Sequence, residues 1–249
     1  MENFGKIMTS KAIEIGCKNT VFKNSHGLDA NGHLSTAYDM ALISSYLYNN
    51  QTLKKIISMK TANIKINNNI KTLKNTNRLL KTNNYITGGK TGYTAGAERC
   101  LMVTAEKEKF SITTIVLGAV NTDIRFNTAN NLVNKTFELY NIYNLQDKLK
   151  WNIKIPLMKS KNKYYKGKYI ENLSIPLIKS ELEEIIITQN ITDILYAPIE
   201  KNTLIGNIKV QIGKETIINK EIYTKEKIQK MSISDYFRLI MEKTFYAFP

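Results

Sequence analysis

The spacing of apolar residues predicts two helices near the start of the chain. Apolar residues recur every three or four positions over residues 4–16, which predicts a helix, and Gly16 suits the position just after its end. Thr36-Ala37-Tyr38-Asp39 is a capping-box pattern, so we expect a second helix over residues 37–48. Residues 24–34, rich in glycine and histidine, should form the loop between these helices.

Alternation of apolar and polar residues predicts strands further along. A short helix or turn over residues 54–60 should lead into a hairpin over residues 63–74 that turns at Asn67-Asn68-Asn69. Three further runs should form an antiparallel meander: residues 86–91, 101–105 and 111–120. Helical spacing returns over residues 123–140, and this helix should pack on the meander.

The pattern changes near residues 144–150, where we place a domain boundary. We assign residues 1–143 to the first domain and residues 151–227 to a β-rich second domain. The clearest strand patterns in the second domain are residues 153–158, 185–188 and 208–212. Residues 232–249 place their apolar side chains on one helical face, which predicts a C-terminal amphipathic helix.

Composition and charge narrow the class of protein. The 249 residues are 43% hydrophobic and 23% charged, as in ordinary globular proteins. The formal net charge of +15 would suit nucleic acid, an anionic membrane surface or an acidic polymer. Only four of the 36 basic residues are arginines, whereas proteins that read bases usually rely on arginine. We therefore expect no nucleic acid as a partner and keep a basic nucleic-acid binder only as a disfavoured alternative.

Metal binding and membrane spanning are not expected from the sequence. His26 and His33 share one loop without a third ligand, and Cys17 and Cys100 have no metal-binding or redox spacing. The most apolar run, residues 112–120, is too short to cross a bilayer. The first residues do not form a secretory signal, so this chain made alone should stay in the cytoplasm.

Lys90-Thr91-Gly92 is the motif with the clearest chemistry. Serine acyl-enzymes of the penicillin-binding class combine this tripeptide with Ser-x-x-Lys and Ser-x-Asn. Four blocks occur in order: Asn24-Ser25-His26-Gly27-Leu28-Asp29, Ser35-Thr36-Ala37-Tyr38-Asp39-Met40-Ala41, Asn75-Thr76-Asn77-Arg78-Leu79-Leu80 and Lys90-Thr91-Gly92-Tyr93-Thr94. Their order and spacing resemble the serine-type D-alanyl-D-alanine carboxypeptidases, the low-molecular-weight penicillin-binding proteins of peptidase family S11. Residues 115–118 with Arg125, and residues 197–199 with Gly206, extend the resemblance.

The resemblance implies a fold class and an activity. The fold would be α/β, a truncated penicillin-recognising (β-lactamase-like) domain with an antiparallel sheet and helices, followed by a small all-β domain and the C-terminal helix. The family hydrolyses the terminal D-alanine from the peptidoglycan pentapeptide through an acyl-enzyme, and it binds β-lactams. No metal or organic cofactor is expected. The family works at the outer face of the cytoplasmic membrane, in the cell envelope.

The resemblance also assigns roles to five residues. Lys90 would provide positive potential at the site. The alternative interpretation is that Lys90 is an ordinary solvated lysine. Thr91 would donate a hydroxyl to the substrate carboxylate, and Gly92 would let the substrate backbone lie along the strand. Tyr93 would contribute its backbone N–H to the oxyanion hole. Arg125 would face the substrate carboxylate. The alternative interpretation is that Arg125 forms an ion pair at the start of its helix.

Within these residues the nucleophile of the family has no counterpart. The Ser-x-x-Lys match at Ser160-Lys161-Asn162-Lys163 lies in a polar turn, where nothing would lower the pKa of the lysine, so we interpret it as coincidence. We expect the chain alone to be inactive and poorly folded, with an exposed strand edge, until an N-terminal half on a separate chain completes it.

Two interpretations stay open beside the enzyme, a noncatalytic scaffold and the disfavoured nucleic-acid binder, and the placement of the C-terminal helix is a separate question. A noncatalytic scaffold could use the same strand to bind peptidoglycan peptides that end in D-Ala-D-Ala. The C-terminal helix over residues 232–249 could pack on its own domain or lie in a membrane surface, and the resemblance favours the membrane.

Overall fold

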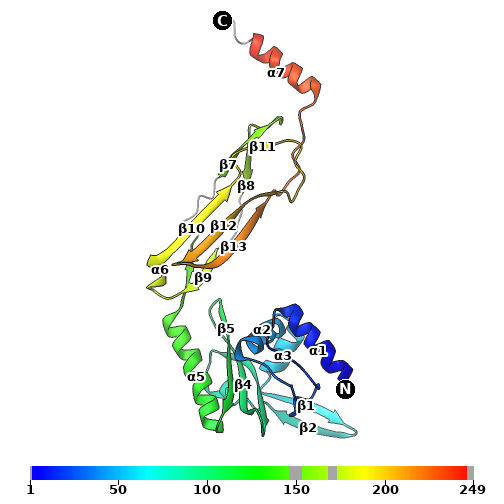
Figure 1. Cartoon of the computed structure of the whole chain (residues 1–249), viewed down its shortest axis with the longest axis vertical. Coiled ribbons are helices and arrows are strands. Elements are labelled where there is room, and N and C mark those ends of the chain that lie inside the picture. Colours follow the sequence, from blue (N-terminus) through cyan, green and yellow to red (C-terminus); the bar gives the residue numbers. More distant parts are fainter. Residues whose placement is uncertain (1, 146–152, 168–172, 246–249) are drawn as a thin grey trace. The chain divides into compact units, whose positions relative to one another are not determined.

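The computed structural model describes residues 2–145, 153–167 and 173–245 (Figure 1). The chain divides into two compact units, Met1–Leu139 and Tyr140–Pro249. Most of the boundary predicted at residues 144–150 lies outside the described residues. The first unit combines helices with antiparallel strands, and the second is built almost entirely of strands, which confirms the predicted fold class.

The first unit contains these elements: α1 (Glu2–Ile15), α2 (Ala37–Tyr48), α3 (Gln51–Ser58), β1 (Thr61–Ile66), β2 (Asn69–Lys74), α4 (Leu79–Thr82), β3 (Ile86–Thr94), β4 (Glu98–Lys107), β5 (Phe110–Ala119) and α5 (Thr122–Leu139). Its central sheet has the strand order β3-β4-β5 with antiparallel pairing, as the meander prediction required. The predicted hairpin forms from β1 and β2, and it turns at Asn67, whose φ is +53°.

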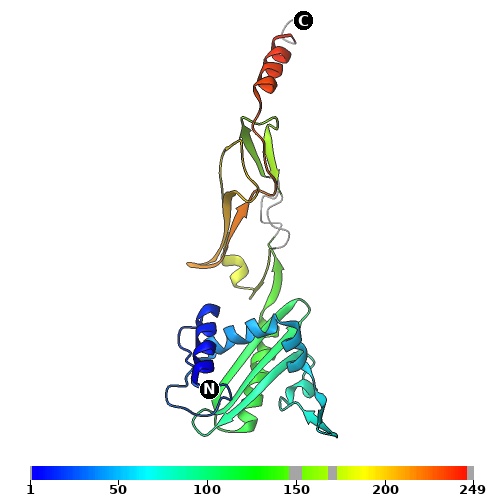
Figure 2. The same cartoon turned by 90° about the vertical axis from the view of Figure 1, so that its right-hand side faces the viewer.

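Helices cover both faces of this sheet (Figures 1 and 2). On one face, Leu101 and Val103 of β4 join Phe126 and Val133 of α5 in a buried apolar core. On the opposite face, the Tyr48 hydroxyl of α2 donates to the Thr87 hydroxyl at 3.0 Å. The alternation of side chains along a strand therefore gives β4 two buried faces, and the sheet lies between two helical layers.

Local capping explains where the first helices begin and end. At the end of α1, Gly16 has a φ of +107°, and the N–H of Cys17 donates to the Ala12 carbonyl at 2.9 Å, as in a Schellman cap. The helix predicted over residues 37–48 is confirmed as α2, with the Thr36 hydroxyl accepting from the Asp39 N–H at 3.1 Å. The helix expected from residue 54 starts at Gln51, because the Asn50 side chain caps the N–H groups of its first turn.

The second unit contains these elements: β6 (Asn141–Asn144), β7 (Ile153–Met158), β8 (Tyr164–Gly167), β9 (Ser174–Leu177), α6 (Glu181–Glu184), β10 (Ile185–Ile191), β11 (Leu195–Tyr196), β12 (Leu204–Ile212), β13 (Glu215–Tyr223) and α7 (Ile233–Phe245). The strands form sheets in the orders β10-β12-β13, β11-β7-β8 and β6-β9. Ile155, Ile205, Ile208 and Val210 are buried in one core that these sheets share. The predicted C-terminal helix is present as α7.

Candidate functional site

Two glycines set β3 close to its neighbours just before the Lys90-Thr91-Gly92 motif. A Cβ atom at Gly89 would lie 2.5 Å from Asn77 Nδ2 and 2.6 Å from the Met102 carbonyl oxygen. A Cβ atom at Gly88 would lie 2.9 Å from Ile57 Cγ1 and from Thr104 Oγ1. Both positions therefore require glycine for packing. This close packing fixes the position of β3 at Gly88 and Gly89, directly before the candidate site at residues 90–92.

Beyond Gly89 the strand comes to the surface. β3 is an edge strand, because among the described strands it pairs with β4 alone. Lys90 and Gly92 are exposed, Thr91 is half-buried, and the Tyr93 side chain is 64% exposed. A Cβ atom at Gly92 would contact Cys100 Cβ at an ordinary 3.7 Å. Packing inside the protein therefore does not require glycine at position 92.

The hydroxyl of Thr91 has a partner that the sequence analysis missed. Thr91 Oγ1 lies 2.6 Å from Thr76 Oγ1, and either atom can donate. Thr76 lies between two asparagines that fix the local backbone: the Asn77 N–H donates to Asn75 Oδ1 at 2.9 Å, and the buried Asn77 side chain donates to the Gly88 carbonyl at 3.3 Å. Residues 75–80 were part of the matched sequence blocks, and this was the signal that could have revealed Thr76.

Lys90 contributes an exposed, positively charged side chain on β3. Its Nζ atom contacts the carbonyl oxygen of the neighbouring Thr91, so the charge is held over the strand. The Lys90 side chain lies at the surface, where its ammonium group can also bind an anionic group.

Arg125 lies in the first turn of α5 and is buried beneath the end of β3. Its side chain is 8% exposed, and Nη1 donates to the carbonyl oxygens of Gly92 at 3.3 Å and Cys100 at 3.4 Å. Burial lowers the pKa of the guanidinium, and nearby Arg99 lowers it further, although an arginine remains charged at neutral pH. The structure thus places a cation directly against the backbone of Gly92.

The helix-start ion pair considered for Arg125 is made by a different arginine. Arg78 Nη2 lies 2.7 Å from Asp123 Oδ1 at the start of α5, and its guanidinium stacks 4.5 Å from the centre of the Phe126 ring. Among the described residues, Arg125 Nε has no hydrogen-bond partner. Arg99 adds a third guanidinium, which lies 5.0 Å from the centre of the Tyr93 ring. The sequence analysis missed the contributions of Arg78 and Arg99, because both depend on contacts between distant elements.

The two histidines of the loop over residues 24–34 take part in hydrogen bonds of the loop itself. His26 Nδ1 accepts from the Leu28 N–H at 3.2 Å, and His33 Nδ1 accepts from the Lys23 N–H at 3.4 Å. Within the part of the chain that the structure describes, no group of three His, Cys, Asp or Glu side chains forms a metal-binding arrangement.

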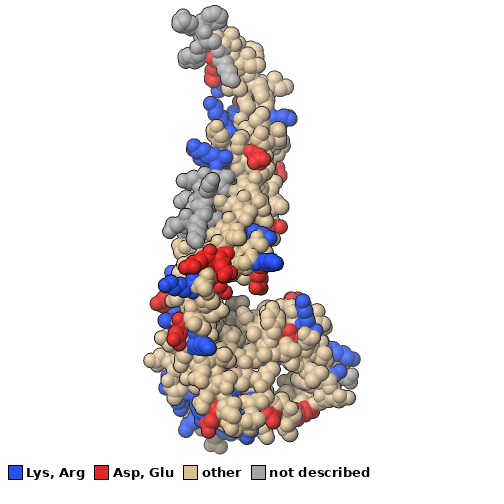
Figure 3. Space-filling model, turned by 60° about the vertical axis from the view of Figure 1, so that its left-hand side comes forward, with Lys and Arg blue, Asp and Glu red and all other residues tan. Residues whose placement is uncertain are grey.

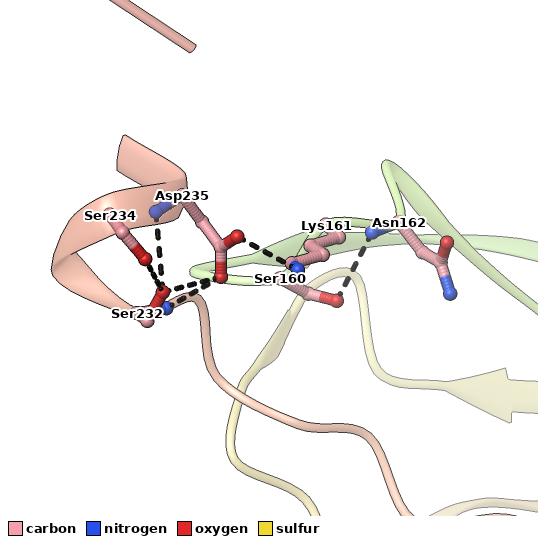
Figure 4. Close-up of polar contacts among 6 residues, drawn as sticks. All are labelled: Ser160, Lys161, Asn162, Ser232, Ser234 and Asp235. Atoms are coloured by element: carbon pink, nitrogen blue, oxygen red, sulfur yellow. Dashed lines mark hydrogen bonds and ion pairs between the residues drawn. The ribbon is translucent and has the colours of Figure 1, made fainter. Parts of the chain in front are cut away.

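The Ser160-Lys161-Asn162-Lys163 turn has a structural role at the start of α7 (Figure 4). Ser160 Oγ accepts from the Asn162 N–H at 3.3 Å, and Lys161 Nζ lies 2.8 Å from Asp235 Oδ1. Asp235 Oδ2 also accepts from the Ser232 N–H at 3.0 Å, and Ser232 Oγ accepts from the Asp235 N–H at 3.2 Å, which together form a capping box. The turn therefore holds the first turn of α7, and Lys163 is exposed rather than buried beside Ser160.

The charges on the surface do not form one continuous basic stripe on the face drawn in Figure 3. Lys and Arg side chains appear there in separate groups with Asp and Glu side chains between them. A protein that follows a nucleic-acid backbone normally carries a continuous basic stripe or patch. This face therefore gives no support to nucleic-acid binding.

The fold and the site together define an α/β unit with the Lys90-Thr91-Gly92 motif on an exposed edge strand, followed by a β-rich unit. A family model described as D-alanyl-D-alanine carboxypeptidase matches residues 1–121, and a model of the penicillin-binding protein 5 C-terminal domain matches residues 137–230. The chain belongs to the D-alanyl-D-alanine carboxypeptidase family of low-molecular-weight penicillin-binding proteins, as the sequence resemblance predicted.

Two carboxypeptidases illustrate the similarity in sequence. The chain is 30% identical over 242 residues to D-alanyl-D-alanine carboxypeptidase DacF of Bacillus subtilis, which covers 96% of this chain and 62% of the relative. It is 28% identical over 232 residues to DacC of Escherichia coli, which covers 92% of this chain and 57% of that protein. The chain thus spans about three fifths of the length of these curated relatives.

Two solved structures illustrate the similarity in fold. Penicillin-binding protein 5 from Haemophilus influenzae superposes with a TM-score of 0.74 at 22% identity, over 92% of this chain and 67% of that one. A variant of the Streptomyces K15 DD-transpeptidase gives a TM-score of 0.52 at 28% identity, over 55% of each chain. The first comparison extends over both units of the chain.

Proposed function

We propose that this chain carries the substrate-recognising part of a serine-type D-Ala-D-Ala carboxypeptidase. The complete enzyme would remove the terminal D-alanine from the peptidoglycan pentapeptide through an acyl-enzyme. The observation that carries this proposal is the exposed edge of β3, which bears Lys90, Thr91 and Gly92, with the buried guanidinium of Arg125 donating to the Gly92 carbonyl.

In this proposal the substrate peptide adds as a strand along the open edge of β3. Lys90 and Arg125 supply positive potential for its terminal carboxylate, and the Thr91 hydroxyl donates to that carboxylate. The exposed Gly92 leaves room for the peptide backbone, which gives a reason for glycine where internal packing gives none. The backbone N–H of Tyr93 stabilises the oxyanion during acyl transfer. A β-lactam would occupy the same edge.

The nucleophilic serine and its lysine base would come from a separate segment that carries Ser-x-x-Lys and Ser-x-Asn. Within these 249 residues, neither motif occurs beside the edge of β3. The outer edge of β5 supports a docking position for such a segment. Among the described strands β5 pairs only with β4, and Leu117 and Val120 near its end are 42% and 64% exposed. The 249-residue polypeptide alone should therefore bind ligand without attacking it.

Intact-mass measurement after incubation with a penicillin tests this proposal. The 249-residue polypeptide should remain unmodified. The same polypeptide mixed with the N-terminal part of a relative that carries Ser-x-x-Lys and Ser-x-Asn should give one covalent adduct, located on the added chain. Replacing Lys90 with alanine in the mixture should reduce adduct formation. A stoichiometric adduct on the 249-residue polypeptide alone would show that it contains its own nucleophile, and Ser160 would be the first residue to replace.

A noncatalytic role in peptidoglycan binding is the second candidate, because the proposed binding groups all lie within the described residues. In that case the polypeptide would bind an acylated D-Ala-D-Ala peptide, and the mixture with the added chain would still release no D-alanine. Both candidates expect binding by the polypeptide, so the D-alanine assay on the mixture is the measurement that separates them.

We also propose that α7 attaches the protein to the outer surface of the cytoplasmic membrane. No helix among the described residues is long and apolar enough to cross a membrane. Instead, α7 exposes Ile233, Phe237 and Ile240, at 90%, 63% and 61%, at spacings that share one helical face. Such a face suits a helix lying in the membrane interface.

A further inference from the structure

We propose that Asp29 is a positioning residue that holds the end of β3 and thereby the backbone of Tyr93. The role of Tyr93 as oxyanion donor rests on the function proposed above. We call the contacts of Asp29 with Thr94 and Gly96 the clamp. They are hydrogen bonds between the loop over residues 24–34 and the turn that follows β3.

The Asp29 carboxylate bridges two points of the β3–β4 turn. Its Oδ1 accepts from the Thr94 hydroxyl at 2.6 Å, and its Oδ2 accepts from the Gly96 N–H at 3.0 Å. Thr94 Oγ1 in turn accepts from the Ala97 N–H at 2.9 Å. These hydrogen bonds lower the pKa of Asp29, with the Thr94 hydroxyl as the main cause. Both carboxylate oxygens thus accept hydrogen bonds from the same turn, and Thr94 lies 65 positions after Asp29 in the chain.

The shape of the turn depends on this carboxylate. A Cβ atom at Gly96 would lie 3.2 Å from Asp29 Oδ1, so glycine permits the close approach. The last pair of the β3–β4 ladder is Thr94 with Glu98, and Glu98 has a φ of +53°. Hairpin ends open more readily than strand centres. A charged contact from outside the hairpin therefore adds order where the ladder itself ends.

The loop that presents Asp29 is itself held at several points. The buried Asn24 side chain accepts from the Gly27 N–H at 2.8 Å and donates to the Leu28 carbonyl at 2.9 Å. At the base of the loop, Val21 and Leu34 form an antiparallel bridge. Asp29 therefore extends from a loop with its own internal order, which a positioning residue requires.

Tyr93 directly precedes Thr94, so the clamp acts one residue from the proposed oxyanion donor. An oxyanion donor contributes to catalysis only while it is aimed at the developing charge, and displacements of about 1 Å can cost on the order of a hundredfold in rate. Loss of the clamp should therefore slow acyl transfer more than it weakens the first binding step, which depends on Lys90 and Thr91.

Amide hydrogen exchange on the 249-residue polypeptide tests the clamp without any assay of activity. In Asp29→Asn and Thr94→Val, we expect the Gly96 and Ala97 amides to exchange on the order of tenfold faster. Thr94→Ser keeps the hydroxyl and should restore the wild-type rates. Asp193→Asn makes the same charge change at an exposed position of the second unit and should alter none of these amides.

Equal acceleration of the β4 core amides at Leu101 and Val103 in Asp29→Asn would indicate a general loss of stability and would overturn the clamp. Unchanged rates at Gly96 and Ala97 would overturn it as well. If Asp29→Asn fails to fold, the comparison of Thr94→Val with Thr94→Ser decides the question alone.

Acylation by a penicillin in the two-chain mixture tests the link to Tyr93. Asp29→Asn should lower the acylation rate at saturation on the order of tenfold, and the half-saturating concentration should change less than twofold. A change in the half-saturating concentration with an unchanged acylation rate at saturation would contradict the proposal that Asp29 positions Tyr93. If the wild-type mixture is not acylated, the proposed function fails, while the exchange experiment still decides whether Asp29 orders the turn.

Discussion

The hydroxyl oxygens of Thr76 and Thr91 lie 2.6 Å apart, one on the segment before α4 and the other in the middle of β3. This contact joins two of the sequence blocks that define the family resemblance. It also orients the Thr91 hydroxyl, because a hydroxyl donates only one hydrogen and accepts through two lone pairs. When Thr76 donates to Thr91, the Thr91 hydrogen is left for a ligand carboxylate.

Replacing Thr76 with valine should therefore weaken binding of an acylated D-Ala-D-Ala peptide. The net value of one such hydrogen bond is about 1 kcal/mol, which corresponds to about a fivefold increase in Kd. Calorimetric titration of the 249-residue polypeptide measures this change. Thr72→Val is the matched control, because the Thr72 hydroxyl donates to Asn63 at 2.8 Å in the exposed hairpin. An unchanged Kd in Thr76→Val would show that Thr76 does not orient Thr91.

Two glycine substitutions on one strand should separate stability from binding. Gly89→Ala forces a Cβ atom to within 2.6 Å of Asn77 Nδ2 and the Met102 carbonyl, and it should lower the free energy of unfolding by about 1–3 kcal/mol. Gly92→Ala meets only Cys100 Cβ at 3.7 Å, so its unfolding midpoint in urea should match the wild type. The Kd for the D-Ala-D-Ala peptide should nevertheless rise in Gly92→Ala. Intact binding in that variant would mean that no backbone lies over Gly92.

The docking of α7 should depend on pH through Asp235. The ion pair with Lys161 and the hydrogen bonds from Ser232 lower the pKa of Asp235 from 3.8 to about 2. A carboxyl with a depressed pKa stabilises the folded arrangement above its unfolded pKa, and this contribution disappears as the pH falls through the folded value. The first turn of α7 should therefore loosen between about pH 4 and pH 2.

Hydrogen exchange of the Asp235 and Tyr236 amides, which donate to Ser232, follows that loosening. Lys161→Met should move the transition to higher pH, because it removes the largest cause of the pKa shift. Lys163→Met is the control, since Lys163 is an exposed lysine of the same turn. A transition that stays in place in Lys161→Met would exclude the ion pair as its cause.

The sequence was most informative where structure depends on neighbouring residues. Thr36 caps α2 through a contact three residues away, and Gly16 ends α1 through its own backbone conformation, so both helix ends were predictable. The capping box at Thr36 is only half formed, however, because Asp39 turns its carboxylate to the Asn19 N–H and the Thr20 hydroxyl, both at 2.7 Å. That long-range use of Asp39 was not visible in the local pattern.

The candidate site was predictable only as a motif. Lys90, Thr91 and Gly92 were identified from the ordered blocks, but the contacts of Arg125 with Gly92 and of Thr76 with Thr91 span 33 and 15 positions. Such contacts are created by the antiparallel sheet and the helix packed on it. Several short strands were missed for a related reason: β6 has four residues and becomes a strand by pairing with β9, about 30 positions away.

The exposed face of α7 should bring the protein to anionic vesicles. Ile233, Phe237 and Ile240 offer apolar area. Lys230 lines a hollow beside Ser232 at the start of the helix, whereas Lys227 in the same hollow is ion-paired with Glu200 at 2.7 Å. Apolar insertion and attraction to acidic headgroups then act at the same place, so binding should weaken as salt rises and persist in part at high salt.

Co-sedimentation with vesicles that contain phosphatidylglycerol tests this prediction. Replacing Phe237 and Ile240 with serine should reduce the bound fraction severalfold, because both side chains are more than 60% exposed and so contribute little to internal packing. Ile186→Ser is the matched control, since Ile186 is 56% exposed on β10, away from α7, and its loss should leave the bound fraction unchanged. If deletion of residues 232–249 leaves binding at low salt intact, α7 is not the membrane contact and the lysine-rich surface alone accounts for attraction to the vesicles.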